Sequence, residues 1–171
     1  MRKVGLLLLL LLAACAPVAT LQPARPADGT GGGLGFSLVT SADLEGIAAL
    51  PYLELHWGDG LREFGVQTQL GASLYAKIRL DEGLAFKAAM GVPGPWYEGA
   101  LLLDAGPVTL SGRLAYAGVE WRGRVDYLWL GGLSATYWYR SWGFEASVLF
   151  GEGGWVPAFS VGYRLEAPAP K

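Results

Sequence analysis

The two side chains with the most distinctive chemistry occur once each, as Cys15 and His56. A single thiol excludes an internal disulfide, and in an exported protein it needs an explanation. A single imidazole excludes a multi-histidine metal site and leaves any Ser-His-Asp triad dependent on His56. Because His56 lies beside Trp57 and next to a glycine-rich turn, we expect it to form hydrogen bonds at an interface or in a lumen, not to act in catalysis.

The other candidate motifs are weak. Gly31-Gly32-Gly33-Leu34-Gly35 is rich in glycine, but neither a helix nor a lysine follows it as a phosphate-binding loop requires. Asp81-Glu82 and Glu152 are carboxylates in predicted turns, and no further ligand converges on them to form a calcium site. We therefore predict no catalytic, cofactor-binding or metal-binding residue and no enzyme activity.

The first residues form a leader for export. Arg2 and Lys3 make a short basic tip, and the apolar run Val4–Leu12 follows it. Nine apolar residues at ~1.5 Å each are too few to cross a ~30 Å hydrocarbon core. The pattern is typical of a secretory signal peptide, which is removed from the mature protein.

The end of the leader, Leu12-Ala13-Ala14-Cys15, resembles the lipobox of bacterial lipoproteins. This resemblance implies cleavage between Ala14 and Cys15, a diacylglycerol on the Cys15 thiol and an acyl chain on the new amine. Two or three acyl chains make a stable membrane anchor. Ala16 follows the cysteine, and the absence of Asp there favours the outer membrane over the inner membrane.

Composition narrows the fold class. Two of the 13 basic residues belong to the leader, so 11 basic residues oppose 15 acidic ones in the mature chain. An acidic balance without a basic patch excludes nucleic acid as a partner. Charged residues make up only 16%, against roughly 25% in soluble domains, while glycine reaches 26 and tryptophan 7. This combination is unusual for a soluble protein.

The chain divides into four regions. Residues 1–14 are the signal peptide, and residues 15–33 are the lipidated cysteine and a Pro-, Gly- and Ala-rich flexible linker. Residues 34–165 are a β-barrel domain, and residues 166–171 are a C-terminal tail.

Apolar and polar residues alternate through residues 34–165, with turn signals between segments, which predicts strands and no long helix. Strands are expected at Leu34–Ser41, Ala48–Trp57, Arg62–Leu80, Leu84–Val92, Trp96–Asp104, Pro107–Trp121, Arg124–Tyr139, Trp142–Phe150 and Trp155–Leu165. Arg62–Leu80 is one strand or two joined near Gly71. The fold class is therefore all-β, an antiparallel up-and-down barrel of about 8–10 strands.

Alternation alone leaves open which face is wet. Two features favour an apolar face that points to lipid, as in a transmembrane barrel. Six of the seven tryptophans flank predicted turns, as an interfacial indole would, and only Trp129 lies in mid-strand. The other face is small or polar with isolated charges, and its candidate lumen charges are Lys77, Arg79, Arg113, Glu145 and Arg164.

At this point residues 34–165 resemble small outer-membrane β-barrels in pattern. The resemblance implies a lipid-anchored outer-membrane barrel of structural or pore-like role, with membrane lipid as its partner. An even number of strands would put both termini on the periplasmic side. The chain departs from the family in its short turns and in its non-aromatic end, Glu166–Lys171.

A soluble, lipocalin-like barrel is the alternative. It would be anchored by lipid, face the periplasm and bind an apolar small molecule. A third hypothesis, a lipid-modifying envelope enzyme, has no visible active-site group beyond His56.

Overall fold

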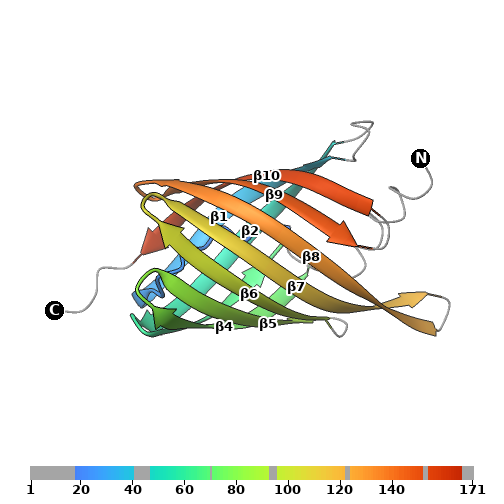
Figure 1. The fold of residues 1–171 in the computed structure, drawn as a ribbon, viewed down its shortest axis with the longest axis horizontal. Helices are drawn as coiled ribbons and strands as arrows, with labels where there is room; N and C mark the ends of the chain where they lie inside the picture. The colour runs from blue at the N-terminus through green and yellow to red at the C-terminus, as the bar shows by residue number, and fades with distance from the viewer. Residues whose placement is uncertain are drawn as a thin grey trace.

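The computed structural model describes residues 18–40, 47–69, 71–92, 96–121, 124–151 and 154–166. Ten strands form one closed antiparallel barrel in up-and-down order (Figure 1). They are β1 (Asp28–Thr40), β2 (Ile47–Asp59), β3 (Arg62–Thr68), β4 (Ala72–Asp81), β5 (Leu84–Val92), β6 (Trp96–Ala105), β7 (Val108–Trp121), β8 (Arg124–Tyr139), β9 (Trp142–Gly151) and β10 (Gly154–Glu166). The predicted fold class is confirmed, and the long segment from Arg62 is two strands, β3 and β4. In the part of the chain described, no helix is long and apolar enough to cross a membrane.

The first strand closes the barrel and begins earlier than the sequence predicted. β1 pairs with β2 from Asp28↔Asp59 to Thr40↔Ile47, and with β10 from Gly31↔Glu166 to Val39↔Ala158. Residues 28–33 therefore belong to the sheet, and their assignment to the flexible linker is wrong. A six-residue run with four glycines has a low β-propensity, so its strand state depends on hydrogen bonds to the neighbouring strands. β10 likewise includes Glu166, which was expected in the C-terminal tail.

The two ends of the barrel differ. We call the end with Gly60, Gly83, Gly106 and Ser141 the turn end, and the opposite end, with Thr40, Gln69 and Trp96, the far end. Glycines with positive φ close three of the turns, with φ of 79° at Gly60, 73° at Gly83 and 63° at Gly106, a conformation that glycine adopts without steric cost. The β7–β8 hairpin projects past its neighbours at the far end (Figure 1).

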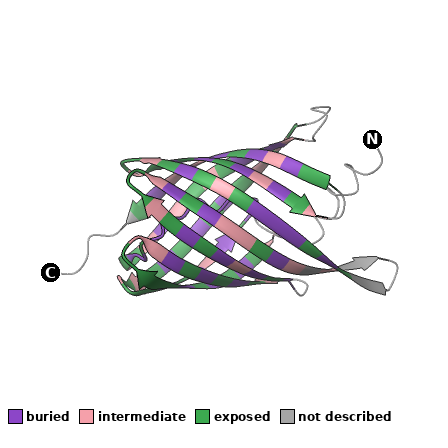
Figure 2. Ribbon diagram, in the orientation of Figure 1, coloured by how far each residue is buried: buried purple, intermediate pink, exposed green. Residues whose placement is uncertain are grey.

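Burial alternates along most of the described strand residues, and the alternation is inside out for a water-soluble protein (Figure 2). Large apolar side chains face outward, including Leu74 (52% exposed), Phe144 (39%) and Phe159 (47%). Gln67, Lys77 and Arg164 face inward and are 1–6% exposed. Of the two orientations left open by the sequence, the structure has the apolar face outside.

The tryptophan positions match the prediction only in part. Trp57, Trp142 and Trp155 are exposed near strand ends, and the Trp121 side chain lies outside the described residues. Trp96 is a correction, because it points into the lumen and is 1% exposed. Trp129 lies within β8, as predicted, but its level in the barrel is set by the neighbouring strand. Leu130 pairs with Gly151, the last residue of β9, so Trp129 lies level with the far end of its neighbour although it is central in β8.

Candidate functional site

Five side chains in the lumen form a network that we call the lumen charge cluster: Glu54, His56, Glu63, Lys77 and Arg164. The Lys77 Nζ lies 2.9 Å from the Glu63 Oε2, and the Arg164 Nη2 lies 3.2 Å from the same oxygen. The Arg164 Nη1 lies 3.7 Å from the Glu54 Oε1, and the His56 Nδ1 lies 3.3 Å from that oxygen. All five residues are at most 6% exposed. Each carboxylate therefore faces more than one positive or donating group.

Strand register explains why these side chains meet. Glu63 and Lys77 are direct partners across β3 and β4. Gly33 of β1 pairs with Glu54 on one side and with Arg164 on the other. Because Gly33 has no side chain, the carboxylate and the guanidinium reach each other across the intervening strand. His56 fits in the same way, since a Cβ on its partner Gly31 would lie 2.4 Å from the His56 Nε2.

Two buried tyrosines complete the cluster. The Tyr52 hydroxyl donates to the Glu54 Oε2 at 2.6 Å. The Tyr75 hydroxyl contacts the Glu54 Oε1 and lies 2.8 Å from the Glu63 Oε1. Hydrogen bonds to ionised carboxylates are roughly twice as strong as those between neutral groups. The two phenols therefore help to hold both carboxylates in place.

A second group of charges lies further round the barrel. The Lys87 Nζ is 3.6 Å from the Glu98 Oε1, and the Arg113 Nη1 is 3.7 Å from the Glu98 Oε2. Lys87 also donates to the Gln67 Oε1 at 3.1 Å. In the described lumen, carboxylates and basic groups are therefore interleaved, as pairing within a narrow barrel requires.

Residues 18–27 lie inside the lumen, and we call them the threaded segment. They precede β1, and Val18, Ala19, Thr20, Leu21 and Gln22 are at most 4% exposed. The sequence predicted that this stretch is a flexible linker outside the fold, and that prediction is wrong for the described residues. The polar lumen wall buries the segment by bonding its backbone.

Lumen side chains bond the threaded segment mainly through its main chain. The Gln69 Oε1 accepts from Val18 N and Ala19 N at 2.6 and 3.0 Å. The Glu145 carboxylate accepts from Thr20 N at 3.0 Å and from Leu21 N at 2.7 Å.

Nearer the turn end, three further groups hold the segment. The Glu63 Oε2 accepts from Ala27 N at 2.6 Å, and the Asp104 Oδ1 accepts from Ala24 N at 3.0 Å. The Lys77 Nζ donates to Pro23 O at 3.1 Å. Glu63 and Lys77 thus serve both the charge cluster and the threaded segment.

Four of the five predicted lumen charges lie in the lumen, and one is exposed. Lys77, Glu145 and Arg164 are buried in the lumen, and the Arg113 side chain is 6% exposed and contacts Val18 O. Arg79 is a correction, since it is exposed and lines a pocket of about 660 Å³ at the turn end. Arg79 keeps the inward register of Lys77 and pairs with buried Ala85, but it lies near the turn end of β4, where its side chain reaches solvent. Ala14 and Cys15 lie outside the described residues.

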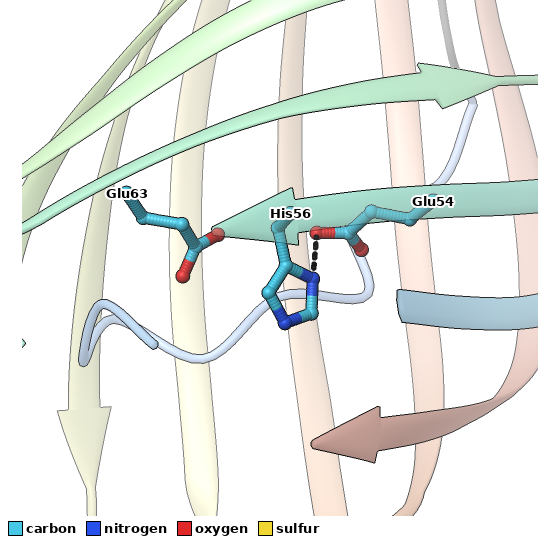
Figure 3. A group of neighbouring side chains, drawn as sticks. All are labelled: Glu54, His56 and Glu63. Carbon is cyan, nitrogen blue, oxygen red and sulfur yellow. Dashed lines mark ion pairs between the residues drawn. The ribbon is translucent and has the colours of Figure 1, made fainter. Parts of the chain in front are cut away.

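Glu54, His56 and Glu63 are the group whose donor types could suit a metal ion, because their ligand atoms lie within 4.8 Å of one another (Figure 3). Lys77 and Arg164 already lie within 3.7 Å of these carboxylates. A divalent cation would have to displace or repel two buried positive charges. The donors therefore fit an ion-pair network better than a metal centre.

Sequence reasoning missed Tyr52, Tyr75 and the contacts of Gln69. The spacing Tyr52, Glu54, His56 is a strand alternation that could have placed all three on one face. His56 itself is fully buried in the lumen, which agrees with one of the two roles expected for it.

Comparisons with known proteins give a fold likeness only. No family model matches the chain, and no curated protein matches it. Among solved structures, Neisserial surface protein A (NspA) is 14% identical, with a TM-score of 0.35 over 81% of this chain and 96% of that one. Ail, the attachment invasion locus protein of Yersinia pestis, is 10% identical, with a TM-score of 0.31 over 81% of this chain and 99% of that one. At TM-scores below 0.5 these likenesses carry no weight for function.

Proposed function

We propose that the protein is a lipid-anchored outer-membrane β-barrel with a structural role, whose lumen is closed by its own threaded segment. The observation that carries this proposal is the inverted distribution of side chains. Large apolar groups cover the outside of a closed barrel, while carboxylates, lysines and an arginine fill the inside. In water, such a barrel would expose a large apolar surface, which is unfavourable. In a membrane, the same surface would contact the apolar acyl chains of the lipids.

The spacing of exposed aromatic residues supports a membrane-spanning height. Three consecutive strands carry aromatic side chains eight residues apart, namely Trp129 and Tyr137 on β8, Trp142 and Phe150 on β9, and Trp155 and Tyr163 on β10. Eight residues span about 26 Å along a strand. At a tilt of about 40° this corresponds to a height of about 20 Å, near the ~25 Å apolar band that aromatic girdles flank in transmembrane barrels.

Neighbouring rings strengthen each girdle. At the far end the Trp129 ring lies 4.8 Å from the Tyr116 ring, and Tyr116 stacks on Tyr127 at 5.1 Å. At the turn end Trp142 meets Tyr163 edge-on at 5.1 Å. Indole and phenol groups favour the membrane–water interface because one end is apolar and the other is polar.

A structural role is favoured over an open pore by the filled interior. Trp96, Lys77, Lys87, Leu102 and His56 are among the largest side chains that are less than 2% exposed. The threaded segment occupies the remaining space between them. The lipocalin-like alternative would need an apolar cavity, whereas the middle of the described lumen is lined by charged groups.

The membrane anchor in this proposal is the acylated Cys15 that the lipobox resemblance implies. Replacing Cys15 with Ser should abolish labelling by radioactive or clickable fatty acid while leaving the barrel folded. Persistent labelling of the C15S variant would overturn the anchor and leave the barrel proposal standing.

The barrel itself is tested by extraction. Membranes containing the full chain are washed with carbonate and with urea, and the pellets are run on gels with and without boiling. A transmembrane barrel should stay in the pellet and migrate faster before boiling than after it, also in the C15S variant. Release of the C15S variant into the wash would refute the membrane-spanning barrel.

A further inference from the structure

The threaded segment crosses the barrel in a defined direction. Val18 packs in an apolar cluster with Val39, Trp96 and Val156, which lie at the far end on β1, β6 and β10. Ala27 N donates to Glu63, the second residue of β3, and Gly60 N donates to Ala27 O in the turn before it. The chain therefore enters the lumen from the far-end side and reaches the turn end by Ala24, whose N donates to Asp104 near the end of β6.

Intermediate contacts fall in the same order. Gln69, which holds Val18 and Ala19, follows the last residue of β3 at the far end. Glu145, which holds Thr20 and Leu21, is the fourth residue of β9, counted from the turn end. The lumen side chains that bond the threaded segment therefore lie closer to the turn end for each later residue of the segment.

Chain length then fixes the side on which the N-terminal end emerges. The segment uses six peptide steps to pass from Val18 to Ala24 at the turn end, and a step covers at most ~3.6 Å. Only three steps, at most about 11 Å, separate Val18 from Cys15. A return to the turn end would need about as many residues as this crossing, through a lumen that is already filled.

We propose that the barrel carries its own N-terminus through the membrane, so that Cys15 lies on the far-end side, opposite to the start of β1 and the end of β10. This inference rests on the proposed membrane-spanning function. Asp28 and Glu166 do lie at the same end, as an even strand number dictates. An even strand number alone would put both ends of the chain on one side of the membrane. The ten residues before β1 cross the lumen, so the start of the chain lies on the opposite side from the end of β10.

The contacts that hold the segment suit a permanent crossing. Val18 to Leu21 bond to Gln69 and Glu145, and each of these side chains accepts from two backbone N–H groups. Withdrawing the segment would remove both backbone N–H donors from the buried Glu145 carboxylate and leave it with the Thr136 hydroxyl. Because these hydrogen bonds go to main-chain atoms, they fix the path of the segment and depend little on the identity of its side chains.

A count of labelled thiols in intact cells tests the topology whichever way the barrel is oriented in the membrane. The full chain is expressed with Pro17→Cys near the anchor and Glu82→Cys at the exposed β4–β5 turn. A maleimide linked to a polyethylene glycol chain that cannot cross the outer membrane is added before and after lysis, and gel shifts count the chains attached to each molecule. The matched control combines Pro17→Cys with Ile47→Cys, at a far-end residue that is 74% exposed.

If the two ends lie on opposite sides, each P17C/E82C molecule gains one chain on intact cells and a second after lysis. The P17C/I47C control gains either none or two on intact cells, because both thiols share a side. The reverse pattern, none or two for P17C/E82C and one for P17C/I47C, would overturn the proposal. So would a Pro17→Cys thiol that stays unreactive after lysis in denaturant-free detergent, since it would then lie within the barrel.

The same samples separate failure of this inference from failure of the proposed function. Carbonate extraction of P17C/E82C reports whether the barrel is embedded at all. A third chain added after lysis reports a free Cys15 thiol and hence a missing acyl group. An embedded, acylated barrel with both thiols on one side would refute only the threaded topology.

Discussion

Lysine substitutions on the outer face distinguish a lipid-facing barrel from a water-facing one. Leu101 is the sixth residue of the ten-residue strand β6 and is 53% exposed. At about 3.3 Å per residue and a tilt of about 40°, it lies roughly 13 Å from the far end of its strand, close to the middle of the apolar band. Leu80 is equally exposed, at 55%, but precedes the last residue of β4 at the turn end.

The two positions should respond differently because depth sets the cost of burying an ammonium group in lipid. Leu101→Lys should lower the free energy of unfolding by about 2–4 kcal/mol, the cost of lysine at a bilayer midplane. Leu80→Lys should cost about 0–1 kcal/mol, since its side chain reaches the interface. A water-exposed surface would give changes within about 0.5 kcal/mol at both sites.

Urea unfolding of the barrel in lipid vesicles, followed by tryptophan fluorescence, measures these differences. Each variant is compared with the parent chain at the same lipid-to-protein ratio. Equal and small effects at Leu101 and Leu80 would refute a lipid-facing exterior. An effect at Leu80 as large as that at Leu101 would place the membrane boundary beyond the turn end.

Two further predictions concern the lumen, and both use the same unfolding assay. Glu63→Gln should cost about 3–5 kcal/mol, because the change leaves Lys77 with a buried, unpaired charge, and E63Q combined with Lys77→Met should cost clearly less than the sum of the single changes. Strict additivity of the two changes would contradict direct pairing. Gly91→Ala should cost about 1–3 kcal/mol, because the new Cβ would lie 1.3 Å from the Trp96 Nε1 and the ring would have to move. Gly112→Ala is the matched control, since its Cβ would meet a leucine methyl at 3.6 Å, and a loss of stability there equal to that of G91A would argue against a specific clash.

The alternation of residue types was sufficient to predict the strands and which residues share a face, whereas the sparse charge on one face was needed to favour that face as the lumen side. Phe144 and Phe159 share the outward phase of their strands, and Lys77 and Arg164 share the inward phase. A period of two residues is a local signal, so it does not depend on which strands are neighbours. The same signal gave Arg79 the inward phase but could not show that its side chain is exposed near the end of β4.

The threaded segment could not be predicted in this way. Val18 and Thr20 are buried only because Gln69 and Glu145, about 50 and 125 residues away, supply acceptors for their N–H groups. The Pro-, Gly- and Ala-rich composition of the segment is typical of a flexible linker when its partners are unknown. Its burial is a property of the closed barrel, which no local pattern encodes.

Closure of β1 onto β10 around the threaded segment also constrains the order of assembly. An N-terminus acylated as proposed could not be pulled afterwards through an interior in which Lys77, Lys87 and Trp96 are at most 1% exposed. The ribbon of strands must therefore wrap around its own leading end before the barrel closes, and the β1–β10 seam joins the first strand to the last. After the barrel has closed, the threaded segment stays enclosed, and it can leave the lumen only if the strands separate again.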